Sequence, residues 1–194
     1  ISVFPGFEIS SSEGVHLLCL FPVDTSTGQL ERYLGGLHID DPDPSPVNSN
    51  QSFAQILEHI EKWNGITIAA HATNNNGLLE VLDGEARVNA WKDERLLAAQ
   101  IPGRVGDLPY NYKQIFTNNN PDYNREYFPA EDLAIAIINA KDVSEPEDLR
   151  KKECTTYIKM TEPTIDALRQ AFLDPLSRIR LVSDFPLDEH ITLV

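Results

Sequence analysis

Three side chains suited to binding metal ions lie beside apolar runs that are typical of buried strands. Glu8 ends the first apolar segment, His16 stands near the start of the run from Val15 to Phe21, and His71 follows Ile66 to Ala70. Carboxylate oxygen and neutral imidazole nitrogen are common protein ligands of zinc and other borderline metals. Such ions activate water for hydrolysis. The types and positions of these residues therefore make them candidate metal ligands.

A fourth candidate ligand, Asp142, follows the apolar run from Leu133 to Ile138 by a few residues. Each candidate also has a structural interpretation, because a histidine beside a buried strand is more often a hydrogen-bonded side chain and a lone carboxylate is usually solvated. A tight antiparallel turn through Ser10 to Gly14 would bring Glu8 and His16 together. The metal-site hypothesis therefore depends on the combination of candidates and not on any one of them.

The elements that must position these side chains predict an α/β fold. Ser52 and Gln55 form a capping-box signal, and apolar residues recur at helical spacing from Phe53 to Ile60. Gly65 is expected to end this helix in the left-handed conformation, and the strand from Ile66 to Ala70 follows at once. A helix that leads into a continuous apolar strand is half of a βαβ unit. In parallel α/β barrels, functional groups project from the C-terminal ends of such strands.

The remaining elements are expected at the following positions. Short helices are predicted over residues 30–37, 78–82 and 93–100, strands over residues 1–8, 133–138 and 155–160, and a last helix with Pro163 in its first turn. The chain opens on Ile1 without a helix cap or a turn, as though within a strand, so we interpret it as a fragment. We assign residues 1–182 to one partial domain and residues 183–194 to a tail or linker to a following domain.

Charge and hydropathy exclude several functions. Sixteen Lys and Arg against thirty Asp and Glu give a net charge of −14 and a pI near 4.6, which excludes a basic surface that grips nucleic acid through its phosphates. Divalent cations bound in a site would reverse this sign locally. The apolar runs are too short to span a bilayer. Cys19 and Cys154 match no metal-binding spacing and indicate reduced thiols in a cytoplasmic protein.

The sequence resembles a PHP domain, of the polymerase and histidinol phosphatase superfamily. The first part of the resemblance consists of residues 5–9, residues 14–18 and the segment that ends at His71. The C-terminal part is more distinctive and is similar to PHP domains fused to AAA-like or SMC-like ATPases. It consists of Asn139 to Val143, Tyr157 to Met160 and Pro163 to Pro175.

The resemblance implies an incomplete, distorted (β/α)7 barrel that holds two or three divalent ions of zinc, manganese or iron in its complete form. In such domains the carboxylate matching Glu8 bridges metals, and the histidines matching His16 and His71 are ligands. The implied reaction is hydrolysis of a phosphoester by metal-activated water, with nucleotides and nucleic acids among the substrates. The implied partner is an ATPase domain of the same parent chain.

Two departures from the PHP pattern leave a second interpretation open. The opening His-x-His motif is absent, because the sequence begins after it. The Asp-x-His motif is replaced by Asn139, Ala140, Lys141 and Asp142, so that Asp142 takes either the Asp or the His position, depending on the register. The alternative to an enzyme is therefore a degenerate, non-catalytic domain with a regulatory or scaffolding role.

Overall fold

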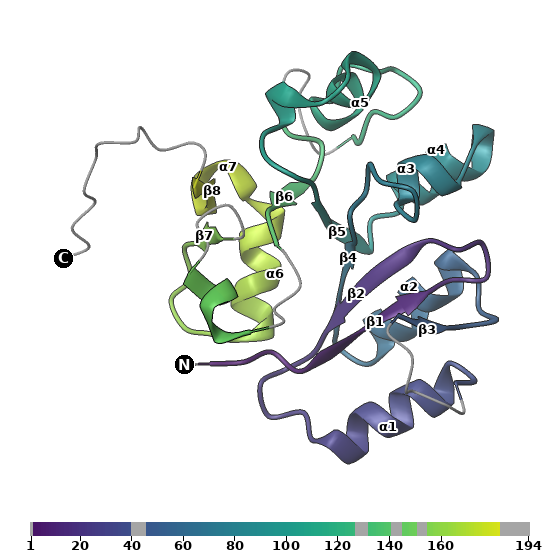
Figure 1. Ribbon diagram of the computed structural model, residues 1–194, viewed down its shortest axis with the longest axis vertical. Helices are drawn as coiled ribbons and strands as arrows, with labels where there is room; N and C mark the ends of the chain where they lie inside the picture. Colours follow the sequence, from purple (N-terminus) through teal and green to yellow (C-terminus); the bar gives the residue numbers. More distant parts are fainter. Residues whose placement is uncertain (1, 40–45, 127–131, 141–144, 151–154, 183–194) are drawn as a thin grey trace.

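The computed structural model describes residues 2–39, 46–126, 132–140, 145–150 and 155–182. Asp142 and the predicted tail, residues 183–194, lie outside these ranges. The strands are β1 (Gly6–Ser10), β2 (His16–Leu20), β3 (Val47–Asn48), β4 (Ile66–Ala69), β5 (Leu96–Gln100), β6 (Ala136–Ile138), β7 (Thr156–Ile158) and β8 (Ile179–Leu181). The first six form one sheet in the order β3-β1-β2-β4-β5-β6, and β7 and β8 form a separate antiparallel pair (Figure 1).

One strand of the six-stranded sheet runs against the others. β2 is antiparallel to both of its neighbours, β1 and β4, whereas the β1–β3, β4–β5 and β5–β6 pairs are parallel. The ends of β1, β4 and β5 therefore meet the beginning of β2 at one edge of the sheet. We call this the C-terminal edge, and the opposite edge, where β4 and β5 begin, the N-terminal edge.

Helices cover the two faces of the sheet unequally (Figure 1). The helices are α1 (Thr27–Gly36), α2 (Phe53–Lys62), α3 (Leu78–Val81), α4 (Gly84–Lys92), α5 (Tyr110–Phe116), α6 (Ile165–Leu173) and α7 (Pro175–Arg178), with 3-10 turns at Val105–Asp107 and Pro146–Arg150. Residues of α1 to α5 pack in the larger core, against one face. Residues of α6 and the β7–β8 pair pack in the smaller core, against the other face.

Strand β2 shows how the sheet separates its two faces. Leu17 and Cys19 are fully buried in the larger core, whereas Leu18 and Leu20 pack against the smaller one. Successive side chains of a strand point to opposite faces. Because Glu8 pairs with Leu18, and Ser10 pairs with His16, Glu8 and His16 share the α6 side of the sheet.

The predicted helix before β4 is confirmed, with a correction at its end. The Ser52 side chain accepts a hydrogen bond from the Gln55 N–H, and the apolar face of α2 is buried. The left-handed residue is Asn64, with φ of 58°, and not Gly65. Gly65 is required for space, because a Cβ at this position would lie 2.7 Å from Ile60 and 2.9 Å from Phe21.

Other predicted elements are shifted or wrong. Residues 93–100 contain strand β5 rather than a helix, and the helix α4 before it was not expected. Pro163 precedes the N-cap Thr164, so it lies outside the first turn of α6. The first strand is Gly6–Ser10, which places Glu8 inside the strand and not at its end. None of the helices in the described ranges has the length and apolar character needed to cross a membrane.

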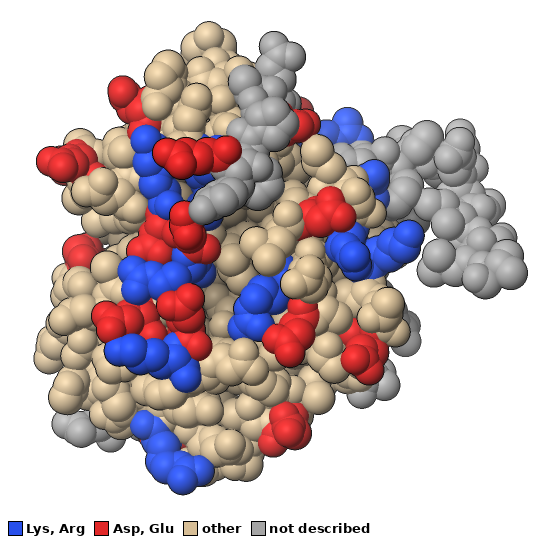
Figure 2. Space-filling model, turned by 180° about the vertical axis from the view of Figure 1, so that it is seen from behind, with Lys and Arg blue, Asp and Glu red and all other residues tan. Residues whose placement is uncertain are grey.

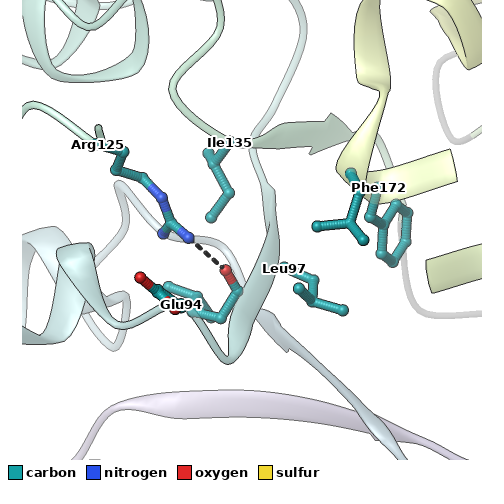
Figure 3. A pocket seen from close by; sticks show the side chains of 7 residues that line it. Glu94, Leu97, Arg125, Ile135 and Phe172 are labelled. Carbon is teal, nitrogen blue, oxygen red and sulfur yellow. Dashed lines mark hydrogen bonds between the residues drawn. The ribbon is translucent and has the colours of Figure 1, made fainter. Parts of the chain in front are cut away.

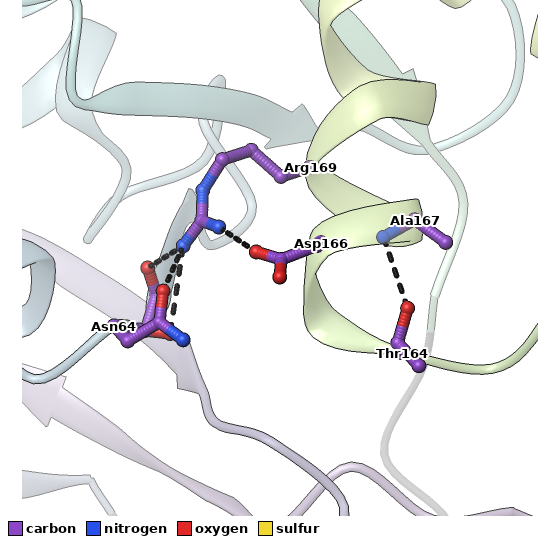
Figure 4. A network of polar contacts seen from close by, with 6 residues as sticks. Asn64, Thr164, Asp166, Ala167 and Arg169 are labelled. Carbon is purple, nitrogen blue, oxygen red and sulfur yellow. Dashed lines mark hydrogen bonds and ion pairs between the residues drawn. The ribbon is translucent and has the colours of Figure 1, made fainter.

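A polar network holds α6 against the sheet at the N-terminal edge. Arg169 donates hydrogen bonds to the side-chain and backbone oxygens of Asn64 and to the Gly65 carbonyl, and it forms an ion pair with Asp166 (Figure 4). The helix itself begins at a cap, where the Thr164 hydroxyl accepts a hydrogen bond from the Ala167 N–H. These contacts fix α6 beside the start of β4, although the two elements are about 100 residues apart in the sequence.

Candidate metal centre

The hairpin between β1 and β2 brings the first two candidate ligands together. Gly14 closes the turn with φ of 92°, and its N–H donates to the Ser11 carbonyl at 2.8 Å. Glu8 lies diagonally opposite His16 on the same face, within reach of a longer side chain. The distance from Glu8 Oε1 to His16 Nδ1 is 3.2 Å. The predicted antiparallel turn and its consequence for this pair are confirmed.

His71 joins this pair from the end of β4. The Ala70 N–H donates to the His16 carbonyl at 3.1 Å, which places the residue after it beside β2. His71 then adopts a positive φ of 31°, a region that few residues other than glycine occupy. The rings of His16 and His71 meet edge to face, and His71 Nε2 lies 3.1 Å from His16 Nδ1.

The geometry of these three side chains fits a common cation. One ligand atom from each of Glu8, His16 and His71 lies within 4.8 Å of the others. Adjacent ligands on a tetrahedral ion with bonds of about 2.0–2.1 Å are separated by about 3.3 Å, which matches the two short contacts. Two histidines and one carboxylate form a known ligand set of catalytic zinc. The donor atoms therefore suit a borderline divalent metal.

The electrostatic environment of His16 favours the form of imidazole that binds metals. Its side chain is only 12% exposed. Burial lowers the pKa of His16 below its usual value, the Glu8 carboxylate opposes this shift, and His71 adds to it. A neutral imidazole has a free lone pair on one nitrogen, whereas a protonated one has none. His16 is thus held as a potential ligand at neutral pH.

An open pocket lies directly beside the cluster. It has a volume of about 470 Å³ and is lined by His71 and by the polar residues Thr73, Asn74, Asn75 and Asn76. The three asparagines are exposed. The sequence predicts a polar loop here, but nothing in its composition indicates that the loop forms a wall of the same site.

Two further side chains organise the C-terminal edge and were not anticipated from the sequence. Gln100, at the end of β5, accepts a hydrogen bond from the His71 N–H and donates one to the Ala140 carbonyl. Asn139 is buried, and its amide donates to the Ile101 and Gly103 carbonyls at 2.8 and 2.9 Å. Both join segments that are 29 to 40 residues apart. Such long-range side-chain contacts have no local sequence signal.

Comparisons with known proteins identify similar folds. Neither protein-family models nor curated proteins match this sequence. Among solved structures, the lesion-specific endonuclease PfuEndoQ from Pyrococcus furiosus is similar, with a TM-score of 0.56 and 15% identity over 86% of this chain and 38% of that one. A structure of Endonuclease Q in complex with a 27-mer duplex substrate, with an abasic lesion at the active site, has a TM-score of 0.58 and 15% identity, over 90% and 40%.

This similarity concerns the fold. The chain spans about two fifths of the length of these structures, 38% and 40%. The α/β class predicted from the sequence is confirmed, as is the likeness to a PHP-type barrel fold. Six of the eight described strands form an open sheet bounded by β3 and β6, which agrees with an incomplete barrel. The metal-binding roles of Glu8, His16 and His71, and of Asp142, stay predictions.

Proposed function

We propose that this chain belongs to a metal-dependent phosphoesterase, with Glu8, His16 and His71 as ligands of a divalent metal. The observation that carries the proposal is the convergence of three Lewis-basic atoms within 4.8 Å at the C-terminal edge of the sheet. The similarity to the fold of an endonuclease supports a phosphodiester as the substrate. A nucleic acid is the favoured substrate class, because one of the similar structures holds a DNA duplex.

The residues of the candidate site would have different roles in such a reaction. Glu8, His16 and His71 would hold the metal, and a bound divalent ion supplies hydroxide near neutral pH and neutralises charge on the phosphoryl oxygens. His16 is neutral at that pH and offers a lone pair. The Glu8 carboxylate, 20% exposed, would balance part of the charge of a bound cation. The asparagine loop beside His71 forms the adjoining wall, where a substrate can lie.

The charge of the protein makes a metal important for binding an anion. On the face seen in Figure 2, basic side chains are interspersed with acidic ones and do not form a continuous basic patch among the described residues. With a net charge of −14, the surface repels a phosphate backbone over long distances. A cation held by Glu8, His16 and His71 would provide positive charge at the point where a phosphoester must bind.

The degenerate regulatory domain is the second candidate. It is favoured by the replacement of the Asp-x-His motif, where Asn139 uses its side-chain Nδ2 to hold the backbone carbonyls of Ile101 and Gly103. The ATPase partner and the metal-binding role of Asp142 also stay predictions. The two candidates differ in one property, since only the enzyme requires a metal for its activity.

Metal content and hydrolysis distinguish the two candidates. Elemental analysis and calorimetric titration with Zn²⁺ or Mn²⁺ should detect at least one bound ion, and the His71→Ala variant should bind it much more weakly. The protein encoded by the natural reading frame that contains this chain should hydrolyse a phosphodiester such as bis-(p-nitrophenyl) phosphate or an abasic duplex. His71→Ala should abolish this activity. Substoichiometric metal in the unaltered protein would contradict the enzyme, and a metal-free protein that still controls an ATPase would support the regulatory role.

A further inference from the structure

Gln100 connects the candidate ligand His71 to the end of the neighbouring strand. Its side-chain Oε1 accepts the His71 N–H at 3.1 Å, and its Nε2 donates to the Ala140 carbonyl at 2.8 Å. The backbone carbonyl of the same residue accepts the Ala72 N–H at 2.9 Å. One residue at the end of β5 therefore holds two consecutive amides of the turn that presents His71.

The backbone at His71 needs such support. Strand β4 ends at Ala69, so the regular hydrogen bonds of the sheet do not extend to the His71 amide. The positive φ of 31° is unfavourable for a residue with a side chain and persists only where its surroundings enforce it. The loop that follows closes against the same turn, since the Asn74 N–H donates to the His71 carbonyl at 2.8 Å. A Cβ on Gly77 would lie 2.2 Å from that carbonyl oxygen.

The other partner of Gln100 lies in a fixed part of the sheet. Asn139, the residue before Ala140, is tied to the chain after β5 through its side-chain bonds to Ile101 and Gly103. Its backbone carbonyl also accepts a hydrogen bond from the Thr156 hydroxyl at 2.9 Å. The end of β6 is therefore held independently of the Gln100 side chain and can serve as an anchor for it.

We propose that Gln100 is a positioning residue for the metal centre, which transmits the rigidity of the β6 end to His71 and so sets the direction of its imidazole. This inference rests on the proposed function, because it assigns a role toward the same metal. Side chains that orient metal ligands through hydrogen bonds affect metal affinity by about 10- to 100-fold when they are removed. A glutamine suits this role because its amide accepts from one strand end while it donates to the next.

The test compares three variants of the full chain loaded with Co²⁺, whose visible absorption spectrum reports ligand geometry. Gln100→Met keeps the length of the side chain and removes both hydrogen bonds. Gln100→Glu keeps the acceptor for the His71 N–H and loses the donor to Ala140. Gln170→Met, at an exposed position of α6, is the matched control. Calorimetry measures Co²⁺ affinity, urea denaturation measures stability, and amide hydrogen exchange of the metal-free protein measures protection of the His71 N–H.

We expect Gln100→Met to weaken Co²⁺ binding by about 10- to 100-fold, to change the Co²⁺ spectrum and to expose the His71 amide to exchange. Gln100→Glu should keep part of the protection of the His71 amide but still weaken Co²⁺ binding and change the spectrum, because its link to Ala140 is lost. Gln170→Met should match the unaltered chain. A folded Gln100→Met or Gln100→Glu variant with lower stability, but with the affinity and spectrum of a cobalt-binding unaltered chain, would overturn the positioning role and leave the metal site intact. If the unaltered chain bound no Co²⁺, the metal site itself would be contradicted, and the role of Gln100 with it.

Discussion

The two edges of the central sheet use polar side chains in opposite ways. At the N-terminal edge, Arg125 donates hydrogen bonds to the Trp91 and Leu96 carbonyls beside a pocket of about 370 Å³ (Figure 3), and Arg169 donates to carbonyls of the α2–β4 turn. At the C-terminal edge, a carboxylate oxygen and two imidazole nitrogens approach one another. The first arrangement pairs donors with acceptors, whereas the second brings acceptors together.

This difference distinguishes polar groups that satisfy one another from polar groups that leave room for a ligand. Buried donors that face carbonyls are satisfied, and they stabilise the fold without a ligand. A carboxylate only accepts hydrogen bonds, and a neutral imidazole carries a single N–H proton. Where a carboxylate and two imidazoles meet, lone pairs therefore face one another, and a cation can occupy the space between them. Charge and partial burial are common to both edges, so they do not identify the candidate site. It is identified by the meeting of acceptor groups that do not satisfy one another.

The largest expected effect removes one ligand at the C-terminal edge. Replacing His71 or Glu8 by alanine should weaken the binding of Zn²⁺ or Mn²⁺ by more than about 100-fold, since direct ligands contribute more than their supporting partners. Isothermal titration calorimetry measures this loss. His59→Ala is the matched control, because His59 lies on α2 and packs against Trp63, the C-cap of that helix. Unchanged affinity in His71→Ala would show that both edges are structural.

The second prediction concerns Arg125 at the N-terminal edge. Arg125→Met should lower the free energy of unfolding by about 2–3 kcal/mol, because two backbone carbonyls lose a charged donor. Burial lowers the pKa of this guanidinium and Asp93 and Glu94 oppose the shift, so the side chain stays charged in the folded protein. Urea denaturation measures the effect, and metal affinity should not change. Arg32→Met, which removes an exposed side chain on α1, should change stability by less than about 0.5 kcal/mol.

How much of each edge can be predicted from the sequence depends on how far apart along the chain the contacting residues lie. The sequence singles out Glu8, His16 and His71 as candidates because each adjoins an apolar strand that is recognisable from the local pattern. Strand β5 was mistaken for a helix because Leu96 to Ala99 are good helix formers, and only burial between β4 and β6 makes them a strand. Gln100 escaped detection because its partners are 29 and 40 residues away. Long-range complementarity is decided by packing and not by local pattern.

A smaller effect is expected from the network that docks α6. Arg169→Met should lower the free energy of unfolding by about 1 kcal/mol, because its hydrogen bonds to Asn64 and Gly65 join α6 to the sheet. Asp166→Asn should cost less than about 0.5 kcal/mol, since this carboxylate is 76% exposed and its ion pair is screened by water. Thermal or urea denaturation of the two variants measures the difference. Equal losses would mean that the ion pair, and not the contact with the sheet, fixes the helix.

The smallest effect is the pH dependence that His16 gives to the metal-free protein. Because its pKa in the folded state lies below the usual value of about 6.5, the unfolded chain binds the proton more readily. Its contribution to stability is therefore present above that pH and is lost as the pH falls through the folded-state pKa. NMR titration of the His16 ring measures the pKa directly, and His16→Gln should reduce the loss of stability in acid.

The Glu8→Gln variant sharpens this last measurement, since it separates burial from charge. The Glu8 carboxylate opposes the downward shift, so its removal should lower the pKa of His16 further and extend the stable range of the neutral ring to lower pH. The same variant should weaken metal binding, because a carboxamide oxygen carries no net charge to balance the cation. Glu8→Gln would thus keep the His16 ring neutral down to lower pH and still weaken metal binding. A rise in the pKa of His16 in Glu8→Gln would contradict the contact between these two residues, and with it the distinction drawn between the two edges of the sheet.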